Sequence, residues 1–172
     1  VAARGCGVFI VHARKAWLKG LSPKENREVP PLNYQRVYQL KRDFPVLTIL
    51  INGGIQSLAE VQNHLMHTDG VMLGRTAYHE PYRLAELEHA LFGTPLPDRM
   101  ALIRQMREYT ERHLAEGGKL NHISRHLLGL FQGLPGARGW RRHLSENAHR
   151  DNADCGVADR ALASLHHPLR VP

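Results

Sequence analysis

Two glycine-terminated apolar runs decide the fold: Leu47 to Ile55 reads LTILINGGI, and Gly70 to Tyr78 reads GVMLGRTAY. Each is a short run of mostly aliphatic residues that stops at glycine, which is typical of a β-strand ending in a tight turn. Between them, SLAEVQNHLMH (57–67) has apolar residues at helical spacing, with Ser57 as a candidate N-cap and Glu60 three positions later. The order strand, helix, strand is the unit from which parallel sheets with right-handed crossovers are built.

The glycines in these turns indicate a phosphate site. A phosphate is bound best by backbone N–H groups at a position where no side chain blocks its approach. Gly53, Gly54 and Gly74 supply such access, and Arg75 adds a fixed positive fork. In barrels of alternating strands and helices, the loops after the last two strands form the usual phosphate site. The alternative is that these glycines only form turns.

A third strand precedes these two. The run GVFIV (7–11) is compact and apolar, and it ends at His12, which would lie at the C-terminal mouth of the sheet or simply close the strand end. The segment 17–32 contains three prolines and several charges, so we expect a long loop that is either functional or only solvated. Amphipathic patterns predict helices over 33–44 and 82–92. Residues 1–93 therefore read as three strand–helix units.

Beyond residue 93 the pattern becomes helical. We expect helices over 98–116, 121–131 and 140–148, within a helical domain that spans 94–150. Between residues 97 and 150 there are ten Lys and Arg against five acids. A basic helical domain favours a nucleic-acid backbone as partner, although a solvated helical bundle is the alternative. The tail, 151–172, is polar and then weakly helical at 157–165, and no function is assigned to it.

Composition excludes several classes. The 172 residues carry a formal charge of +7, and no apolar run approaches 18 residues, so neither a membrane span nor a signal peptide is expected. Cys6 and Cys155 lie far apart and outside any CxxC pattern, which predicts no disulfide framework and no metal site. A reducing compartment, the cytoplasm, is the expected location. The start at Val1, inside the approach to a strand, suggests a truncated fragment.

Four motifs together resemble the C-terminal half of a tRNA-dihydrouridine synthase, specifically of the A subfamily. They are FIVHARKAWLKGLSPKENREVPPL (9–32), INGGI (51–55), DGVMLGRTAYHEP (69–81) and SRHLLGLFQGLPGARGWRRHLSENAH (124–149). The likeness spans roughly residues 4 to 150. It implies the last part of a (β/α)8 TIM barrel followed by an all-α tRNA-binding domain.

The resemblance also implies the chemistry. In this family reduced FMN passes a hydride to C6 of a D-loop uridine, at position 20 or 20a, that is flipped out of the tRNA, and NADPH reduces the flavin afterwards. Carried over by position, the flavin-binding residues are His12, Asn52, Gly53, Gly54, Gly74 and Arg75. The tRNA-contacting residues are Lys24, Arg27, Arg138 and Arg141. Spacing alone would not select these last four.

The family's catalytic cysteine, a general acid that protonates C5, is expected upstream of Val1, so no catalytic residue is assigned in this chain. We expect this polypeptide to be inactive alone and the full-length enzyme to be monomeric. Two alternatives stay open: another FMN-dependent barrel oxidoreductase that acts on a small molecule, and a catalytically silent RNA-binding module. Flavin retention separates the enzymes from the silent binder.

Overall fold

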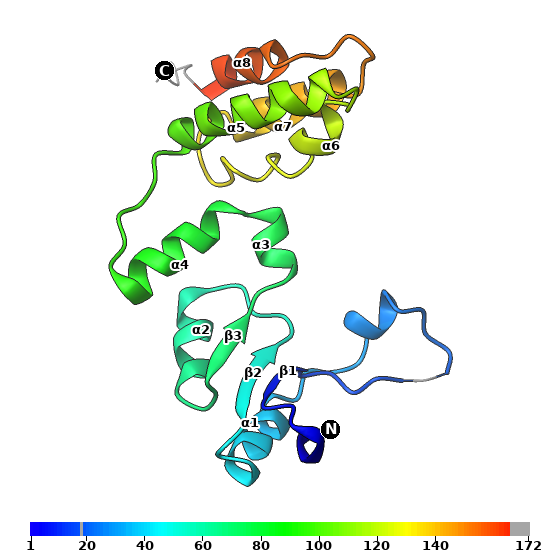
Figure 1. Ribbon diagram of the computed structural model, residues 1–172, viewed down its shortest axis with the longest axis vertical. Helices are drawn as coiled ribbons and strands as arrows, with labels where there is room; N and C mark the ends of the chain where they lie inside the picture. The colour runs from blue at the N-terminus through cyan, green and yellow to red at the C-terminus, as the bar shows by residue number, and fades with distance from the viewer. Residues whose placement is uncertain (18, 166–172) are drawn as a thin grey trace, which may run out of the picture. The chain divides into compact units, whose positions relative to one another are not determined.

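The computed structural model describes residues 1–17 and 19–165 (Figure 1). The end of the expected tail, 166–172, lies outside the described residues. The chain divides into two compact units, 1–76 and 77–172, and each is described by itself. The predicted domain boundaries at residues 93 and 150 stay predictions.

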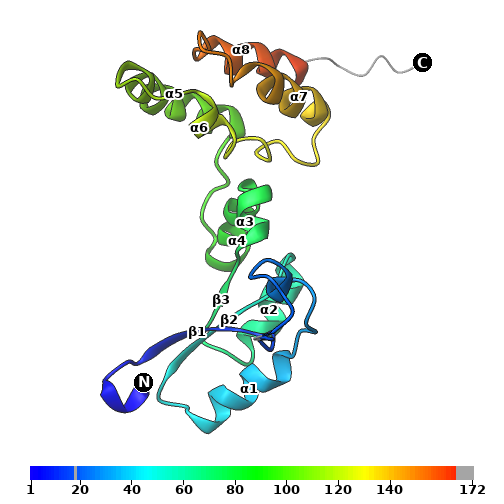
Figure 2. The same cartoon turned by 90° about the vertical axis from the view of Figure 1, so that its right-hand side faces the viewer.

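The first unit alternates strands and helices. Its elements are η1 (Ala2–Arg4), β1 (Val8–His12), η2 (Glu25–Arg27), α1 (Tyr34–Asp43), β2 (Thr48–Asn52), α2 (Leu58–Leu65) and β3 (Gly70–Met72). The three strands form one parallel sheet in the order β1-β2-β3 (Figure 2). The α/β class and the three expected strands are therefore confirmed.

One face of this sheet is covered by helices. Ile49 and Ile51 of β2 are 1% and 0% exposed, and α1, which packs against β2, buries Val37 as well. The opposite face is open, since Val8 and Ile10 of β1 are 60% and 59% exposed. Residues paired in register lie on the same face, so this open face continues across β2.

Local caps explain where the helices begin. The Ser57 hydroxyl accepts from the Glu60 N–H at 3.3 Å, and a carboxylate oxygen of Glu60 accepts from the Ser57 N–H at 2.9 Å. This capping box opens α2 as the sequence predicts. The Ser57 hydroxyl, which donates to the Glu60 carboxylate at 2.8 Å, and the Gln56 N–H, which donates to it at 3.0 Å, lower the pKa of this carboxyl. Asn33 caps α1 by accepting from the Arg36 N–H at 3.0 Å.

The second unit is helical in its described part. It holds most of α3 (Arg75–His79), then α4 (Tyr82–Phe92), α5 (Arg99–Ala115), α6 (Asn121–Ser124), α7 (Ala137–Asn147), α8 (Gly156–Leu162) and η3 (Ala163–Leu165). Trp140 and Leu144 of α7 and Ala161 of α8 are at most 1% exposed and centre the core. The weakly helical segment expected in the tail is thus packed against α7.

The helix expected over 121–131 is wrong, because α6 ends at Ser124 and the chain continues in turns. Several carbonyls of this stretch accept from the backbone N–H three residues later, as in turns, and others accept from side chains that are distant in sequence. Arg99 donates to the carbonyls of Leu130 and Gln132 at 3.0 and 3.3 Å, and Trp140 Nε1 donates to the Leu127 carbonyl at 3.0 Å. These partners are distant in sequence, so local periodicity could not reveal them.

Two other boundaries differ from expectation. The GRT turn after β3 is the start of a short helix, α3, which the sequence pattern did not indicate. The third helix begins at Ala137 instead of Trp140, directly after Gly136, whose φ of 83° ends the preceding turn. Among the described helices none is both long and apolar enough to cross a bilayer.

Candidate functional site

The carboxyl ends of the three strands build one pocket. His12 and Asn52 end β1 and β2 and are paired in register, so their side chains share a face. The Gly53–Gly54 turn follows directly, and Gly74 with Arg75 follows β3. All six of these predicted residues line a single cavity of about 220 Å³, together with Arg27. The parallel sheet therefore brings together residues that are up to 63 positions apart in the chain.

Gly53 and Gly54 are required by the fold itself. Their φ angles of 127° and 73° are ones that L side chains rarely adopt. An added Cβ would also lie 2.9 Å from Leu32 Cδ2 at Gly53 and 2.8 Å from Leu32 Cδ1 at Gly54. The turn-forming explanation therefore accounts for this pair without any ligand.

Gly74 is different. It needs no positive φ, and apart from Gly74 itself and its two chain neighbours no heavy atom of the described protein lies within 4 Å of the position where its Cβ would stand. Neither backbone conformation nor packing within the described residues explains a glycine here, although Gly74 lines the pocket. The bare backbone at Gly74 leaves room for a group from outside the chain.

Tyr34 holds the glycine turn from the first residue of α1. Its hydroxyl donates to the Gly53 carbonyl at 2.8 Å, and partial burial raises the pKa of this phenol, which keeps the donor protonated. The Tyr34 ring packs edge-on against His64, 4.4 Å between centroids. His64 is 2% exposed, and its Nδ1 is 2.7 Å from the Tyr38 hydroxyl. Sequence reasoning missed Tyr34, because nothing local marks a tyrosine whose hydroxyl reaches a turn nineteen residues later.

The pocket gathers positive charge around His12. Partial desolvation, and then the guanidinium groups of Arg14, Arg75 and Arg27, lower the pKa of His12. The Arg14 N–H donates to His12 Nδ1 at 3.3 Å, so the ring proton is on Nε2. The arginines near this imidazole favour an anionic ligand in the pocket.

The long loop 17–32 is joined to this pocket. Arg75 pairs with Glu28 at 3.0 Å, and a second contact is made between the Arg14 guanidinium and the Pro30 carbonyl. Asn26 accepts from the Trp17 N–H at 2.8 Å and donates to the Trp17 carbonyl at 2.9 Å, closing the loop on itself. These contacts hold the described part of the loop, residue 17 and residues 19–32, and Arg27 of this part lines the pocket wall.

The four residues predicted to contact RNA fall into two pairs. Lys24 and Arg27 belong to the first unit, and both are exposed around η2. Arg138 and Arg141 belong to α7 in the second unit, where Arg138 is exposed and Arg141 donates to the Gln132 side chain. The structure places only Arg27 among the strand-end residues.

The two cysteines lie outside the strand-end pocket. Cys6 is exposed before the N-terminal end of β1, opposite to the end that carries His12. Cys155 is buried, and this burial raises the pKa of its thiol. Within the described residues, no three His, Cys, Asp or Glu side chains are grouped as metal ligands would be.

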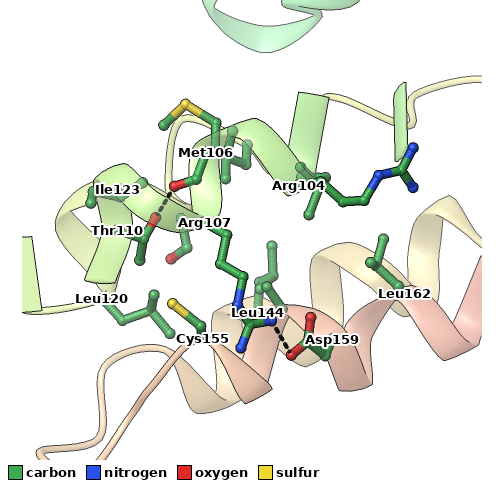
Figure 3. A pocket seen from close by; sticks show the side chains of 14 residues that line it. Arg104, Met106, Arg107, Thr110, Leu120, Ile123, Leu144, Cys155, Asp159 and Leu162 are labelled. Atoms are coloured by element: carbon green, nitrogen blue, oxygen red, sulfur yellow. Dashed lines mark hydrogen bonds and ion pairs between the residues drawn. The ribbon is translucent and has the colours of Figure 1, made fainter. Parts of the chain in front are cut away.

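A second cavity lies inside the helical unit, between α5, α6, α7 and α8 (Figure 3). Its volume is about 70 Å³ and its walls are mostly apolar, including Ile103, Leu120 and Leu144. Arg107 Nη1 bonds Asp159 at 2.8 Å across its edge, and Cys155 lines it as well.

Comparison with known proteins gives the family. The family model for dihydrouridine synthase (Dus) matches residues 1–166. A tRNA-dihydrouridine(20/20a) synthase of Shewanella oneidensis is 60% identical over 171 residues, which cover 98% of this chain and 51% of that protein. Proteins of the same name from Salmonella typhi and Escherichia coli K12 are 62% and 60% identical, over 91% and 94% of this chain and 48% of each relative. This chain thus spans about half the length of the curated relatives it matches. With a matching family model over nearly all of its residues, the chain belongs to the dihydrouridine synthase family.

Proposed function

We propose that these residues form the flavin-phosphate and tRNA-binding part of an FMN-dependent tRNA-dihydrouridine(20/20a) synthase that uses NADPH as reductant. Similarity to proteins of that name supports the reaction and the tRNA substrate. The observation that carries the cofactor assignment is Gly74: a glycine with open space at its Cβ position, in a pocket that also holds two arginines.

The residues present fit an FMN phosphate. Gly74 offers bare backbone and Arg75 offers fixed charge that favours a phosphate dianion, while Arg27 in the same pocket wall is assigned to the RNA contact. Asn52 adds a neutral amide, and His12, with its lowered pKa, would face the flavin as a neutral ring. Tyr34 would act through the Gly53 carbonyl by fixing the turn.

The open face of the sheet supports the barrel. Val8 and Ile10 would cost free energy if they stayed in water, since about 25 cal/mol is lost for each Å² of apolar surface left exposed. A (β/α)8 barrel covers this face with the side chains of its other strands. We propose that β1, β2 and β3 are three neighbouring strands of such a barrel.

The basic helical segment supports the RNA partner. Ten Lys and Arg against five acids between 97 and 150 favour contact with a phosphate backbone. Extruding a base from a folded RNA costs a few kcal/mol, which electrostatic contacts must offset. Lys24, Arg27, Arg138 and Arg141 are the proposed contacts.

The chemistry divides between cofactor and chain. Bound FMN, once reduced by NADPH, supplies the hydride that saturates the uracil ring. The residues of this chain bind and orient: the strand ends hold the phosphate, His12 keeps its proton on Nε2, and the arginines hold the RNA. The general acid is expected to come from a cysteine outside these 172 residues.

The test is a titration of the purified chain with FMN, followed by quenching of flavin fluorescence, beside a titration with unmodified tRNA. Saturable binding of both supports the proposal. Intact tRNA affinity without flavin binding would instead favour the catalytically silent RNA-binding module. Flavin binding without tRNA affinity would favour an oxidoreductase acting on a small molecule. A uridine-reduction assay tests the expectation that the chain is inactive alone, and measurable turnover would contradict it.

A further inference from the structure

A third cavity lies in the second unit, and none of the strand-end residues lines it. It is about 530 Å³, within the range of small-ligand pockets. Tyr78 and His79 at the end of α3 line it, and so do Arg125, Gln132 and Arg141.

Tyr78 is an exposed aromatic residue whose ring is held in place by neighbouring side chains. It is 51% exposed although tyrosine rings normally gain by burial. Its ring lies edge-on to His79 and His126, with centroids 5.6 and 5.4 Å apart and interplanar angles of 80° and 89°. Two imidazoles thus fix the ring while about half of its surface faces solvent. Such a rigid, half-exposed aromatic is what proteins use to stack an unpaired base.

Gly129 allows the turns over residues 125–134 to pack closely against the end of α3. A Cβ at Gly129 would collide with the His79 carbonyl oxygen, so only glycine lets the 125–134 turns approach this backbone. The turns of this segment, which replace the expected helix, place His126 against Tyr78 and Arg125 in the lining of the same cavity. The shape of the pocket is built into the second unit.

Charge in the pocket favours an anion. Within the described residues neither Arg125 nor Arg141 forms an ion pair with a carboxylate. Arg125 Nε donates to His126 Nε2 at 3.2 Å, and Arg141 donates to the Gln132 amide oxygen. The pocket's one lining carboxylate, Glu80, is paired with Arg83 at 3.2 Å. Two guanidinium groups beside an aromatic ring match the phosphate and base of a single nucleotide.

We propose that this pocket binds one nucleotide of the tRNA, distinct from the uridine that is reduced, with its base against Tyr78 and its phosphate held by Arg125 and Arg141. The inference rests on the proposed function in so far as it requires the chain to bind tRNA. It adds Tyr78 and Arg125 to the proposed RNA contacts, and it names the phosphate of this nucleotide as the group that Arg141 binds.

The experiment measures binding of unmodified tRNA to the full chain by fluorescence anisotropy over a series of salt concentrations. Tyr78→Ala should weaken binding between about 5-fold and 150-fold, the range seen when a stacked base loses its aromatic partner. Tyr78→Phe keeps the ring and should stay within about twofold. Tyr109→Ala is the matched control, because Tyr109 is 52% exposed on α5 and does not line the pocket.

The salt series separates the two kinds of contact. Arg125→Gln and Arg141→Gln should each lower the slope of log affinity against log salt by about one, since each removes one phosphate contact. Tyr78→Ala should weaken binding without changing the slope. Ultraviolet cross-linking of wild-type chain to tRNA should yield a nucleotide adduct on Tyr78, a result that does not depend on how any variant folds.

If wild-type chain binds tRNA while Tyr78→Ala binds as tightly as Tyr109→Ala, this inference is overturned and the proposed function stands. Absence of any tRNA binding by the wild-type chain overturns both. A wild-type circular dichroism spectrum and urea midpoint of Tyr78→Ala would show that the second unit keeps its fold and that the loss is confined to RNA.

Discussion

The strand-end pocket and the cavity between α5, α7 and α8 differ in almost every respect. The first has backbone and polar walls with two glycine turns, a histidine and two arginines. The second is lined mostly by apolar side chains, and Arg107 and Asp159 form an ion pair at its edge (Figure 3). The apolar cavity forms where four helices pack imperfectly, whereas the polar pocket forms where three strands stop.

The two cavities differ in whether packing within the protein explains the residues that line them. Atoms around the helical cavity are explained by the core they belong to, since Leu144 and Ile103 would be buried without any guest. In the strand-end pocket, Gly74 has no explanation inside the described residues. Variants should therefore change stability in one region and ligand affinity in the other.

Leu144→Ala should have the largest effect. Leu144 is 1% exposed and lines the helical cavity, so truncation enlarges an existing void and should cost about 2–5 kcal/mol of unfolding free energy. Urea denaturation measures it. Leu134→Ala, at a leucine that is 44% exposed in the same unit, is the control and should cost far less. Equal losses of unfolding free energy at both positions would mean that Leu144 does not belong to a packed core.

Gly74→Ala addresses the strand-end pocket. The methyl group meets nothing within the described protein, so the denaturation midpoint should stay at the wild-type value while FMN binds about tenfold more weakly or worse. Gly7→Ala is matched, because its Cβ also meets nothing and it lies outside the pocket. Wild-type FMN affinity in Gly74→Ala would refute the phosphate site.

Tyr34→Phe tests the support of the glycine turn. Loss of the hydrogen bond to the Gly53 carbonyl should cost about 1 kcal/mol, seen as a few-fold weaker FMN binding. Isothermal titration of both proteins measures the difference. If stability falls but flavin affinity does not, Tyr34 supports the fold only.

His64 predicts a pH dependence in the α/β unit. Burial lowers the pKa of His64, so the unfolded state binds a proton more readily than the folded state. This contribution to stability is complete above the unfolded value of about 6.5 and is lost as the pH falls toward the lower folded value. His64→Gln should flatten the curve of unfolding free energy against pH, which urea denaturation over a pH series measures, and an unchanged curve would contradict this role of His64.

The Arg107–Asp159 pair should have the smallest effect. Both side chains are about half exposed, at 49% and 52%, so water and salt screen their attraction. A double-mutant cycle with Arg107→Gln and Asp159→Asn should give a coupling close to the error of the measurement. A large coupling free energy would show that this ion pair stabilises the helical unit more than its solvent exposure implies.

Local patterns predicted much of the α/β unit. Apolar runs ending at glycine located β2 and β3, and Ser57 with Glu60 located the start of α2. The same turns supplied the residues that now share one pocket, because parallel strands always end at the same edge.

The remaining features depend on contacts that cross the chain. The turns after α6 are set by Arg99 and Trp140, and the glycine turn is held by Tyr34. The short α3 follows a glycine that read equally well as the end of a strand. The family-derived residues Lys24, Arg27, Arg138 and Arg141 had no spacing signal, and their contact with RNA stays a prediction.

The ion pair between Arg75 and Glu28 makes two ligands interdependent. Any phosphate that draws on Arg75 competes with Glu28, the residue next to Arg27 in the loop that is proposed to meet RNA. Binding of a phosphate at Arg75 would then change the affinity of the loop for RNA. By thermodynamic linkage, binding of RNA would change the affinity for the phosphate by the same factor. If both proposed ligands bind, the half-exposed carboxylate of Glu28 would couple flavin binding to RNA binding.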